Sequence, residues 1–258
     1  MYLIAELHNQ YSGDLATAEQ MILQAKMYGA QAVKVQLYDS ERLYGNRSRQ
    51  YLSLSFDETR CLQAYAAMLK IDFFASCFDE ERLGWCLELD FPVLKLASIT
   101  VEQDFKLCRR AVRTGRRTII SLGRWDWKAR GVPFDAPNVE YLYAVSKYPA
   151  TLEDVEMPDF RRSVFAGYSD HVIGTTAACY AIARGARVLE KHFMLSPSLQ
   201  KDTEKAHAGG MTCDDLRAIR NFWDGMRILE RRGQAYEAPR TAKKKAPAPS
   251  AALTGGRA

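Results

Sequence analysis

The chain has 258 residues, 47% of them hydrophobic and 26% charged, a length that fits one large barrel or two small domains. This composition is typical of a globular protein, and no apolar run is long enough to span a membrane. The body is close to neutral, so the formal net charge of +5 does not indicate a nucleic-acid partner. The excess positive charge lies in the final stretch, at Arg240, Lys243, Lys244, Lys245 and Arg257.

The six cysteines include no close CxxC pair, and several lie in apolar helical patterns. We therefore expect reduced, buried thiols rather than a disulfide framework. The apolar run Tyr2–Ala5 is broken at once by Glu6 and has no basic flank, so it does not resemble a signal peptide. Together these features predict a cytoplasmic protein.

Short β-rich runs alternate with helical patterns along the chain. Such alternation predicts parallel strands, and eight bulky strands favour a closed (β/α)₈ TIM barrel over an open sheet. The expected strands are Tyr2–Leu7, Ala32–Leu37, Asp72–Ser76, Val93–Ser98, Thr118–Gly123, Tyr141–Ser146, Val164–Tyr168 and Val188–Phe193. The expected helices are Leu15–Tyr28, Asp57–Lys70, Glu80–Glu88, Asp104–Thr114, Thr175–Arg184 and Cys213–Arg232.

Two segments depart from this pattern. Residues 124–140 contain Gly131, Pro133 and Pro137 without a clear helical period, so we expect a loop or a stunted helix in the fifth βα unit. From about Pro239 the chain is rich in Ala, Pro, Lys, Ser and Gly, which cannot bury a core. We therefore divide the chain into a single barrel domain, residues 1–236, and a disordered basic tail, residues 237–258.

Polar groups stand at the ends of all eight expected strands, where barrels of this kind carry their chemistry. Lys34 and Lys95 lie inside apolar strands, so each must find an anion, either a protein carboxylate or a ligand. Ringed by serine hydroxyls, they suit a phosphate or a carboxylate. In strand order the polar residues are Glu6, Lys34, Gln36, Ser76, Lys95, Ser98, Ser121, Ser146, Tyr148, Ser169, His171, Glu190 and His192.

Two of the four histidines fall at the ends of consecutive expected strands, His171 on the seventh and His192 on the eighth. These strands are neighbours in a barrel, so the two imidazoles can converge on a divalent transition metal. The alternative is that each histidine bonds to a neighbouring carboxylate. Spacing alone leaves both interpretations open.

Six segments in order carry a family resemblance. Phe165–His171 contains G-Y-S-D-H and Leu189–Phe193 reads L-E-K-H-F, which resemble two motifs of the N-acetylneuraminate (sialic acid) synthase family. The other four segments are Ala30–Gln36, Phe73–Asp79, Leu94–Ser98 and Val145–Pro149. Together they span nearly all of residues 2 to 230, so the chain resembles the barrel of this family.

The resemblance implies a reaction in which phosphoenolpyruvate condenses with an aldehyde similar to N-acetylmannosamine and phosphate leaves by C–O cleavage. It implies a divalent metal, usually Mn²⁺, on His171 and His192. It places phosphoenolpyruvate on Lys34, Ser76, Lys95, Ser98, Ser121, Ser146 and Ser169. It gives catalytic roles to Glu6, Gln36, Tyr148 and Glu190. Of these, Gln36, Tyr148 and Glu190 would face the sugar.

Departures from the family pattern concern the sugar side. The first family motif reads E-I-G-x-N-H-N-G, and here Gln10 and Tyr11 replace its Asn-His pair. Ser146 stands where the family has Asn. We expect the barrel to occur without the C-terminal antifreeze-like domain, which in the family contributes an Arg to the sugar site. A separate antifreeze-like protein and a second copy in a homodimer are therefore the expected partners besides the two substrates.

Two alternatives to this synthase follow. One is a non-catalytic or accessory barrel that keeps ligand binding, which the altered first motif favours and the intact histidine segments oppose. The other is a different phosphoenolpyruvate-dependent aldolase or synthase that uses the same scaffold with another aldehyde.

Overall fold

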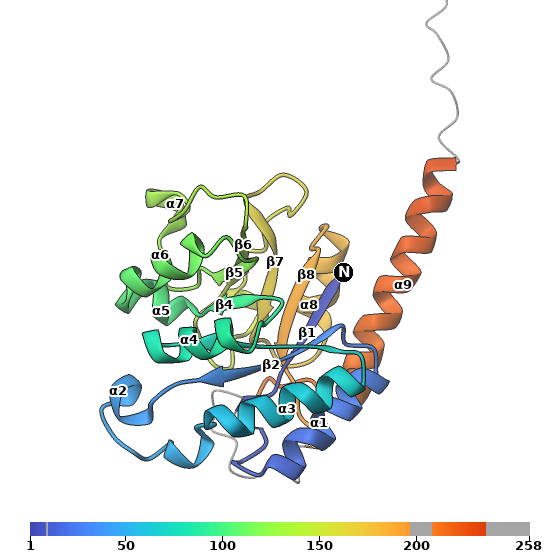
Figure 1. Cartoon of the computed structure of the whole chain (residues 1–258). Coiled ribbons are helices and arrows are strands. Elements are labelled where there is room, and N and C mark those ends of the chain that lie inside the picture. The colour runs from blue at the N-terminus through green and yellow to red at the C-terminus, as the bar shows by residue number, and fades with distance from the viewer. Residues whose placement is uncertain (9, 197–207, 236–258) are drawn as a thin grey trace, which may run out of the picture.

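The computed structural model describes residues 1–8, 10–196 and 208–235. Eight parallel strands pair in chain order, and β1 also pairs with β8, so the sheet closes into a barrel (Figure 1). The predicted TIM-type fold is confirmed. The strands are β1 (Tyr2–Glu6), β2 (Ala32–Leu37), β3 (Asp72–Cys77), β4 (Leu94–Leu96), β5 (Thr118–Ser121), β6 (Val139–Ala144), β7 (Phe165–Asp170) and β8 (Val188–His192).

Helices surround the barrel, and several begin at a side chain that accepts a backbone N–H. Asp14, Ser55, Asp79 and Asp104 cap their helices in this way, which satisfies groups that the helix leaves without a partner. The helices are α1 (Leu15–Met27), α2 (Ser40–Tyr44), α3 (Phe56–Met68), α4 (Glu80–Glu88), α5 (Ser98–Gln103), α6 (Phe105–Arg113), α7 (Trp127–Arg130), α8 (Thr176–Ala183) and α9 (Cys213–Ala235), with 3₁₀ turns η1 (Gln50–Leu52) and η2 (Leu152–Asp154).

The shortened fifth βα unit is confirmed, because only the four-residue α7 follows β5 before the chain turns at Gly131, whose φ is 66°. Three features were not predicted. Short helices α2 and α5 follow β2 and β4, and the sixth unit has the 3₁₀ turn η2 in place of an α-helix. The expected strand through Ser98 was too long, since β4 ends at Leu96 and Ser98 begins α5.

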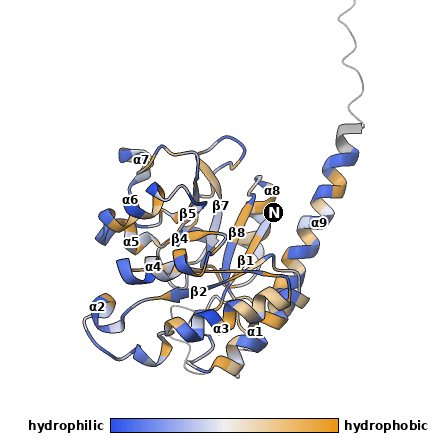
Figure 2. Cartoon of the chain, viewed as in Figure 1, coloured by the Kyte–Doolittle hydropathy of each residue, from blue (hydrophilic) through white to orange (hydrophobic). Residues whose placement is uncertain are grey.

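The interior is filled by strand side chains, and the core is continuous from the barrel to the inward faces of the helices. Figure 2 shows hydrophobic residues along β1 and β8 and alternating hydrophobic and hydrophilic bands on α9. Gly167 on β7 is required by close packing, because a Cβ there would lie 1.7 Å from the carbonyl oxygen of Val188 on β8. The backbone of β7 therefore approaches β8 closely, two residues before the paired site residues Ser169 and Glu190.

The cysteine prediction is confirmed for pairing but not wholly for burial. All six cysteines are free. Cys77, Cys86 and Cys108 are buried, whereas Cys61 is exposed because it lies on the outer face of α3. No helix in the described ranges has the length and apolarity needed to cross a membrane. The predicted tail at 237–258 lies outside the described residues.

Candidate active site

A small pocket, here called the inner pocket, lies at the carboxyl ends of the strands and has a volume of about 50 Å³. Besides Ala97, its walls consist entirely of residues that the sequence singled out. They are Glu6, Lys34, Gln36, Ser76, Lys95, Ser98, Ser121, Tyr148, Ser169, His171, Glu190 and His192. Ser146 is the exception, since it lines a larger neighbouring cavity instead.

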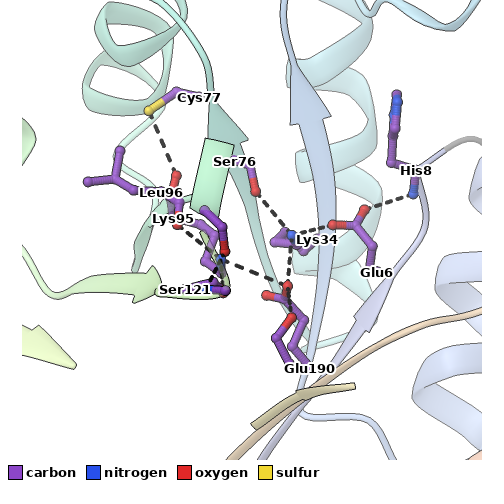
Figure 3. A network of polar contacts seen from close by, with 12 residues as sticks. Glu6, His8, Lys34, Ser76, Cys77, Lys95, Leu96, Ser121 and Glu190 are labelled. Carbon is purple, nitrogen blue, oxygen red and sulfur yellow. Dashed lines mark hydrogen bonds and ion pairs between the residues drawn. The ribbon is translucent and has the colours of Figure 1, made fainter. Parts of the chain in front are cut away.

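Lys34 projects from β2 into the inner pocket, where two carboxylates compensate its charge (Figure 3). Its Nζ pairs with Glu6, donates to Ser76 Oγ at 3.0 Å and lies 3.2 Å from Glu190 Oε1. Burial alone would lower the pKa of Lys34, but Glu190 and Glu6 outweigh it and raise that pKa above its usual value. Lys34 is therefore a fixed cation.

Lys95 reaches the same pocket from β4 with weaker compensation. Its Nζ donates to Ser121 Oγ at 2.8 Å and to the Leu96 carbonyl at 3.2 Å, while Glu190 Oε1 is 3.9 Å away (Figure 3). Burial lowers the pKa of Lys95 to about 8, and the charge of Lys34 adds to this effect against the attraction of Glu190. A second anion near Lys95 would therefore be stabilised.

The Glu190 carboxylate lies between the two lysine side chains. Its Oε1 also accepts a hydrogen bond from Ser169 Oγ at 3.2 Å, and its Oε2 has no hydrogen-bond partner among the described residues. Burial would raise the pKa of Glu190, but Lys34 and Lys95 overcome it and hold that pKa below its usual value. The ionised carboxylate thus occupies the space beside both lysine Nζ atoms.

The two predicted metal-binding histidines face each other across the mouth of this pocket. The ring centroids of His171 and His192 are 6.1 Å apart, and the Tyr148 ring lies 4.1 Å from that of His171. His171 Nδ1 is 2.6 Å from the Val145 carbonyl oxygen, which only accepts, so Nδ1 carries the proton. Burial lowers the pKa of His171 to about 4, which leaves a neutral ring with an unprotonated Nε2.

Lys191 and Asp170 belong to the same motifs but lie on the opposite face of their strands. Because side chains alternate along a strand, Glu190 and His192 point into the barrel while Lys191 points outward. There its Nζ pairs with Asp170 Oδ2 at 2.9 Å, and both side chains are 0% exposed. Asp170 Oδ1 also accepts from the Val172 N–H at 2.9 Å. This pair joins β7 to β8 and fixes the strand ends that carry the histidines.

A larger cavity of about 330 Å³, here called the outer cavity, adjoins the inner pocket and shares part of its wall. The shared residues are Gln36, Ala97, Ser98, Tyr148 and His192. The remaining walls come from loops and short helices beyond the strands: His8, Leu43, Tyr44, Arg49, Phe78, Ile99, Arg124 and Ser146.

Sequence reasoning missed most of this outer wall. Arg49 and Tyr44 lie around helix α2, which carries too few residues to show a helical period. His8 had one available signal, its place two residues after Glu6 in the first motif, and it is buried beside the Tyr38 ring at 5.2 Å. Side chains in loops have no fixed alternation, so no pattern indicated that they would meet.

Comparison with known proteins places this chain in a family. A family model described as the NeuB family matches residues 21–224. The chain belongs to the NeuB family. Among curated NeuB-like relatives, an uncharacterised protein of Methanocaldococcus jannaschii is 30% identical, with 77% of this chain and 64% of the relative aligned. The N-acetylneuraminate-9-phosphate synthase of Homo sapiens is 28% identical, over 85% of this chain and 69% of that protein.

A solved structure agrees with this placement. The N-acetylneuraminic acid synthetase of Leptospira borgpetersenii, in complex with citrate, superposes with a TM-score of 0.79 at 25% identity, covering 93% of this chain and 87% of that one. The resemblance expected from the motifs is confirmed at the level of the NeuB family. The chain spans about two thirds of the length of the curated relatives described above.

Proposed function

We propose that the chain is a phosphoenolpyruvate-dependent synthase that makes a sialic acid-type keto sugar acid. In this reaction the enol carbon of phosphoenolpyruvate attacks the aldehyde of an N-acylated amino sugar such as N-acetylmannosamine. Water adds to the former enol carbon bearing the phosphate ester, and phosphate leaves by C–O cleavage. The observation that carries the proposal is the pair of buried lysines, Lys34 and Lys95, with serine hydroxyls at the mouth of a NeuB-family barrel.

The lysines and serines would bind the phosphate and carboxylate of phosphoenolpyruvate, because a polyanion requires several fixed donors in a site of low dielectric. Lys34 supplies a permanent charge, and Lys95 gains a counterion. Ser76 accepts a hydrogen bond from Lys34, Ser121 accepts one from Lys95, and Ser169 donates one to Glu190. These three hydroxyl groups would bind the ligand oxygens. Ser98 and Ser146 lie farther out and would contact the ligand at its outer end.

The histidine pair fits a divalent metal, which NeuB-family enzymes typically use. His171 donates Nδ1–H to a carbonyl and presents an unprotonated Nε2, the arrangement common to metal-binding histidines. His192 faces it, although the described part of the chain contains no group of three or more His, Cys, Asp or Glu that could hold a metal. When bound, the ion, Mn²⁺ in this proposal, would polarise the aldehyde oxygen.

The chain's own residues then position the aldehyde. Gln36 and Tyr148 lie on the wall shared by the pocket and the cavity, where they would orient the sugar over the enol carbon. Glu190, once displaced from the lysines, and Glu6 would accept and return the proton of the attacking water. Burial raises the pKa of Tyr148 to about 12, so its phenol stays protonated as a hydrogen-bond donor.

The domain division, the cytoplasmic location and the partners belong to the same proposal. Six free cysteines support a reducing compartment. A homodimer and a separate antifreeze-like protein stay predictions, as do the barrel limits at 1–236.

The decisive experiment measures phosphate release from phosphoenolpyruvate with a panel of N-acylated hexosamines, with and without Mn²⁺. We expect release that depends on both the sugar and the metal. Phosphoenolpyruvate binding without release for any sugar would favour the accessory, non-catalytic barrel. Release with unrelated aldehydes alone would favour another synthase of the same scaffold.

A further inference from the structure

We infer that two copies of this chain associate through helix α9, with the two helices side by side and running in opposite directions around a twofold axis. The surface involved lies on the outside of the barrel and includes no residue of the inner pocket or the outer cavity. The association is therefore independent of the proposed function.

Helix α9 packs on the barrel along one of its faces. Leu216 and Ile219 are fully buried, and Trp223 and Met226 pack against the same core farther along the helix. In Figure 1, α9 stands at the edge of the molecule. The face that carries these four residues is therefore already used within the chain, and only another face is available to a partner.

A second apolar stripe runs along the exposed side of α9. Phe222, Ile228 and Leu229 are 37%, 59% and 66% exposed. Four small or apolar residues follow one another at intervals of four, three and four, the spacing of a coiled-coil seam: Ala218, Phe222, Gly225 and Leu229. A helix that packs on a single partner needs one apolar stripe, so the second stripe fits a second helix.

Gly225 lies in the middle of this stripe, where the described residues do not require a glycine. A Cβ added at this position would meet no heavy atom within 4 Å. Glycine inside a helix destabilises it relative to alanine, because glycine loses more conformational freedom on folding. The absent side chain does, however, leave room for a large side chain from another molecule.

The stripe is complementary to itself when two copies run in opposite directions. In an antiparallel pair centred between residues 223 and 224, Phe222 faces Gly225 of the second copy and Ala218 faces Leu229 of the second copy. Each layer then combines a large side chain with a small one, so the layers fill evenly. A parallel pair would set Phe222 against Phe222 and Gly225 against Gly225, which crowds one layer and leaves the next empty.

Charges at the two ends of the stripe favour the same direction. Asp215 lies three residues before Ala218 and Arg232 lies three residues after Leu229, so both continue the seam. In the antiparallel pair, Asp215 faces Arg232 of the second copy at both ends of the interface, because of the twofold axis. The Thr212 N–H donates to Asp215 Oδ2 at 2.9 Å and helps to position that carboxylate. A parallel pair would bring like charges together at each end.

Sedimentation velocity of the full chain at increasing concentration tests the association. We expect a reversible dimer that dissociates in the micromolar range, because one helix pair buries less surface than a standard interface. Gly225→Phe should weaken the dimer at least about tenfold, since two large side chains would then meet in each central layer. Phe222→Ala combined with Gly225→Phe should recover it, because the large and small positions are only exchanged.

Gly84→Phe is the matched control. Gly84 also lies inside a helix, α4, where a Cβ would meet nothing within 4 Å, so this variant should leave the dimer unchanged. Arg232→Asp should weaken the dimer severalfold, because it places two carboxylates opposite each other. Circular dichroism checks that each variant keeps the fold, which the open space around Gly225 permits.

A chain that stays monomeric at every concentration would overturn the inference and assign the stripe to a different helix. A dimer that Gly225→Phe leaves intact would also overturn it, as would a double variant that does not recover the dimer. Equal loss in Gly84→Phe would place the interface elsewhere and have the same effect. Phosphate release from phosphoenolpyruvate tests the proposed function separately, and its absence would leave the association of the two helices as inferred.

Discussion

The inner pocket and the outer cavity share a wall but are built in different ways. Inner-pocket charges project from β1, β2, β4 and β8, are almost completely buried, and contact one another within a few ångströms. Cations of the outer cavity come from loops, and Arg124 is about half exposed. Strands therefore hold the inner charges in fixed positions, while loops supply the cations of the outer cavity.

The largest effect separating the two regions concerns stability. Lys191→Met leaves the Asp170 carboxylate buried without its cation, which costs about 3–5 kcal/mol of the free energy of unfolding. Arg124→Gln on the outer wall should change that free energy by less than about 0.5 kcal/mol, because its partner is half exposed. Denaturant unfolding measures both.

The double variant Lys191→Met with Asp170→Asn serves as the control, because it removes the buried charge along with its partner. It should recover much of the lost stability, and this remains measurable even where the single variant does not fold. A single variant as stable as the wild type would show that the pair does not hold β7 to β8.

The next effect concerns the metal. His171→Ala should abolish stoichiometric Mn²⁺ binding, measured by electron paramagnetic resonance, because His192 would be left as the only imidazole of the facing pair. His8→Gln is the matched control on the outer wall and should leave binding unchanged. Equal losses in both variants would place the ion in the outer cavity and break the comparison.

A smaller effect is expected on the affinity for anionic ligands, with opposite signs for two neighbouring residues. Lys95→Met keeps the apolar stem and removes the charge, so affinity should fall more than tenfold, about 1.4 kcal/mol or more. Glu190→Gln removes the carboxylate that occupies the lysines, so affinity for inorganic phosphate should rise. Calorimetry measures both, and the idea fails if Glu190→Gln weakens phosphate binding.

The smallest effect is a pH dependence that only the inner pocket should show. Burial lowers the pKa of Lys95 to about 8, so its charge is present below pH 8 and is lost above it. Phosphoenolpyruvate affinity should therefore fall by up to about tenfold between pH 7 and 9. Lys95→Met should flatten this profile, and an unchanged profile would assign it to another group.

Folding stability should respond to Lys95 in the opposite direction. Its pKa in the folded chain lies below that of an unfolded lysine, so the unfolded chain binds more protons between pH 8 and about 10.4. Lys95 by itself therefore makes the fold more stable as pH rises through that window. If phosphoenolpyruvate affinity falls with rising pH while the free energy of unfolding does not, the loss of binding is due to Lys95 and not to general alkaline unfolding.

Much of the fold and the inner pocket followed from periodicity. Eight strands alternating with helices predicted the barrel, and a period of two residues put Lys34 and Gln36 on one face of β2. The same period separates Glu190 and His192, which line the pocket, from Lys191, which pairs behind it. Backbone geometry alone determines these directions, so one sequence suffices to predict them.

The outer wall could not be predicted in this way. Arg49 lines the cavity from the segment between the five-residue helix α2 and the 3₁₀ turn η1, and neither element shows a recognisable period. Ser146 follows β6 by two residues, so it was predicted for the inner pocket but lines only the outer cavity. Tertiary packing decides the position of such side chains, and local sequence carries little information about it.

Closure of the sheet has a consequence for synthesis of the chain on the ribosome. β1 pairs with β8 along its whole length, from Tyr2 opposite Val188 to Glu6 opposite His192. One edge of β1 therefore has no partner strand until β8 has emerged, roughly 10–40 s later at ordinary rates of translation. During that time the nascent chain exposes an unpaired strand edge, which invites pairing with other chains. The link between the first and last strands thus makes the interval before β8 emerges a period of aggregation risk.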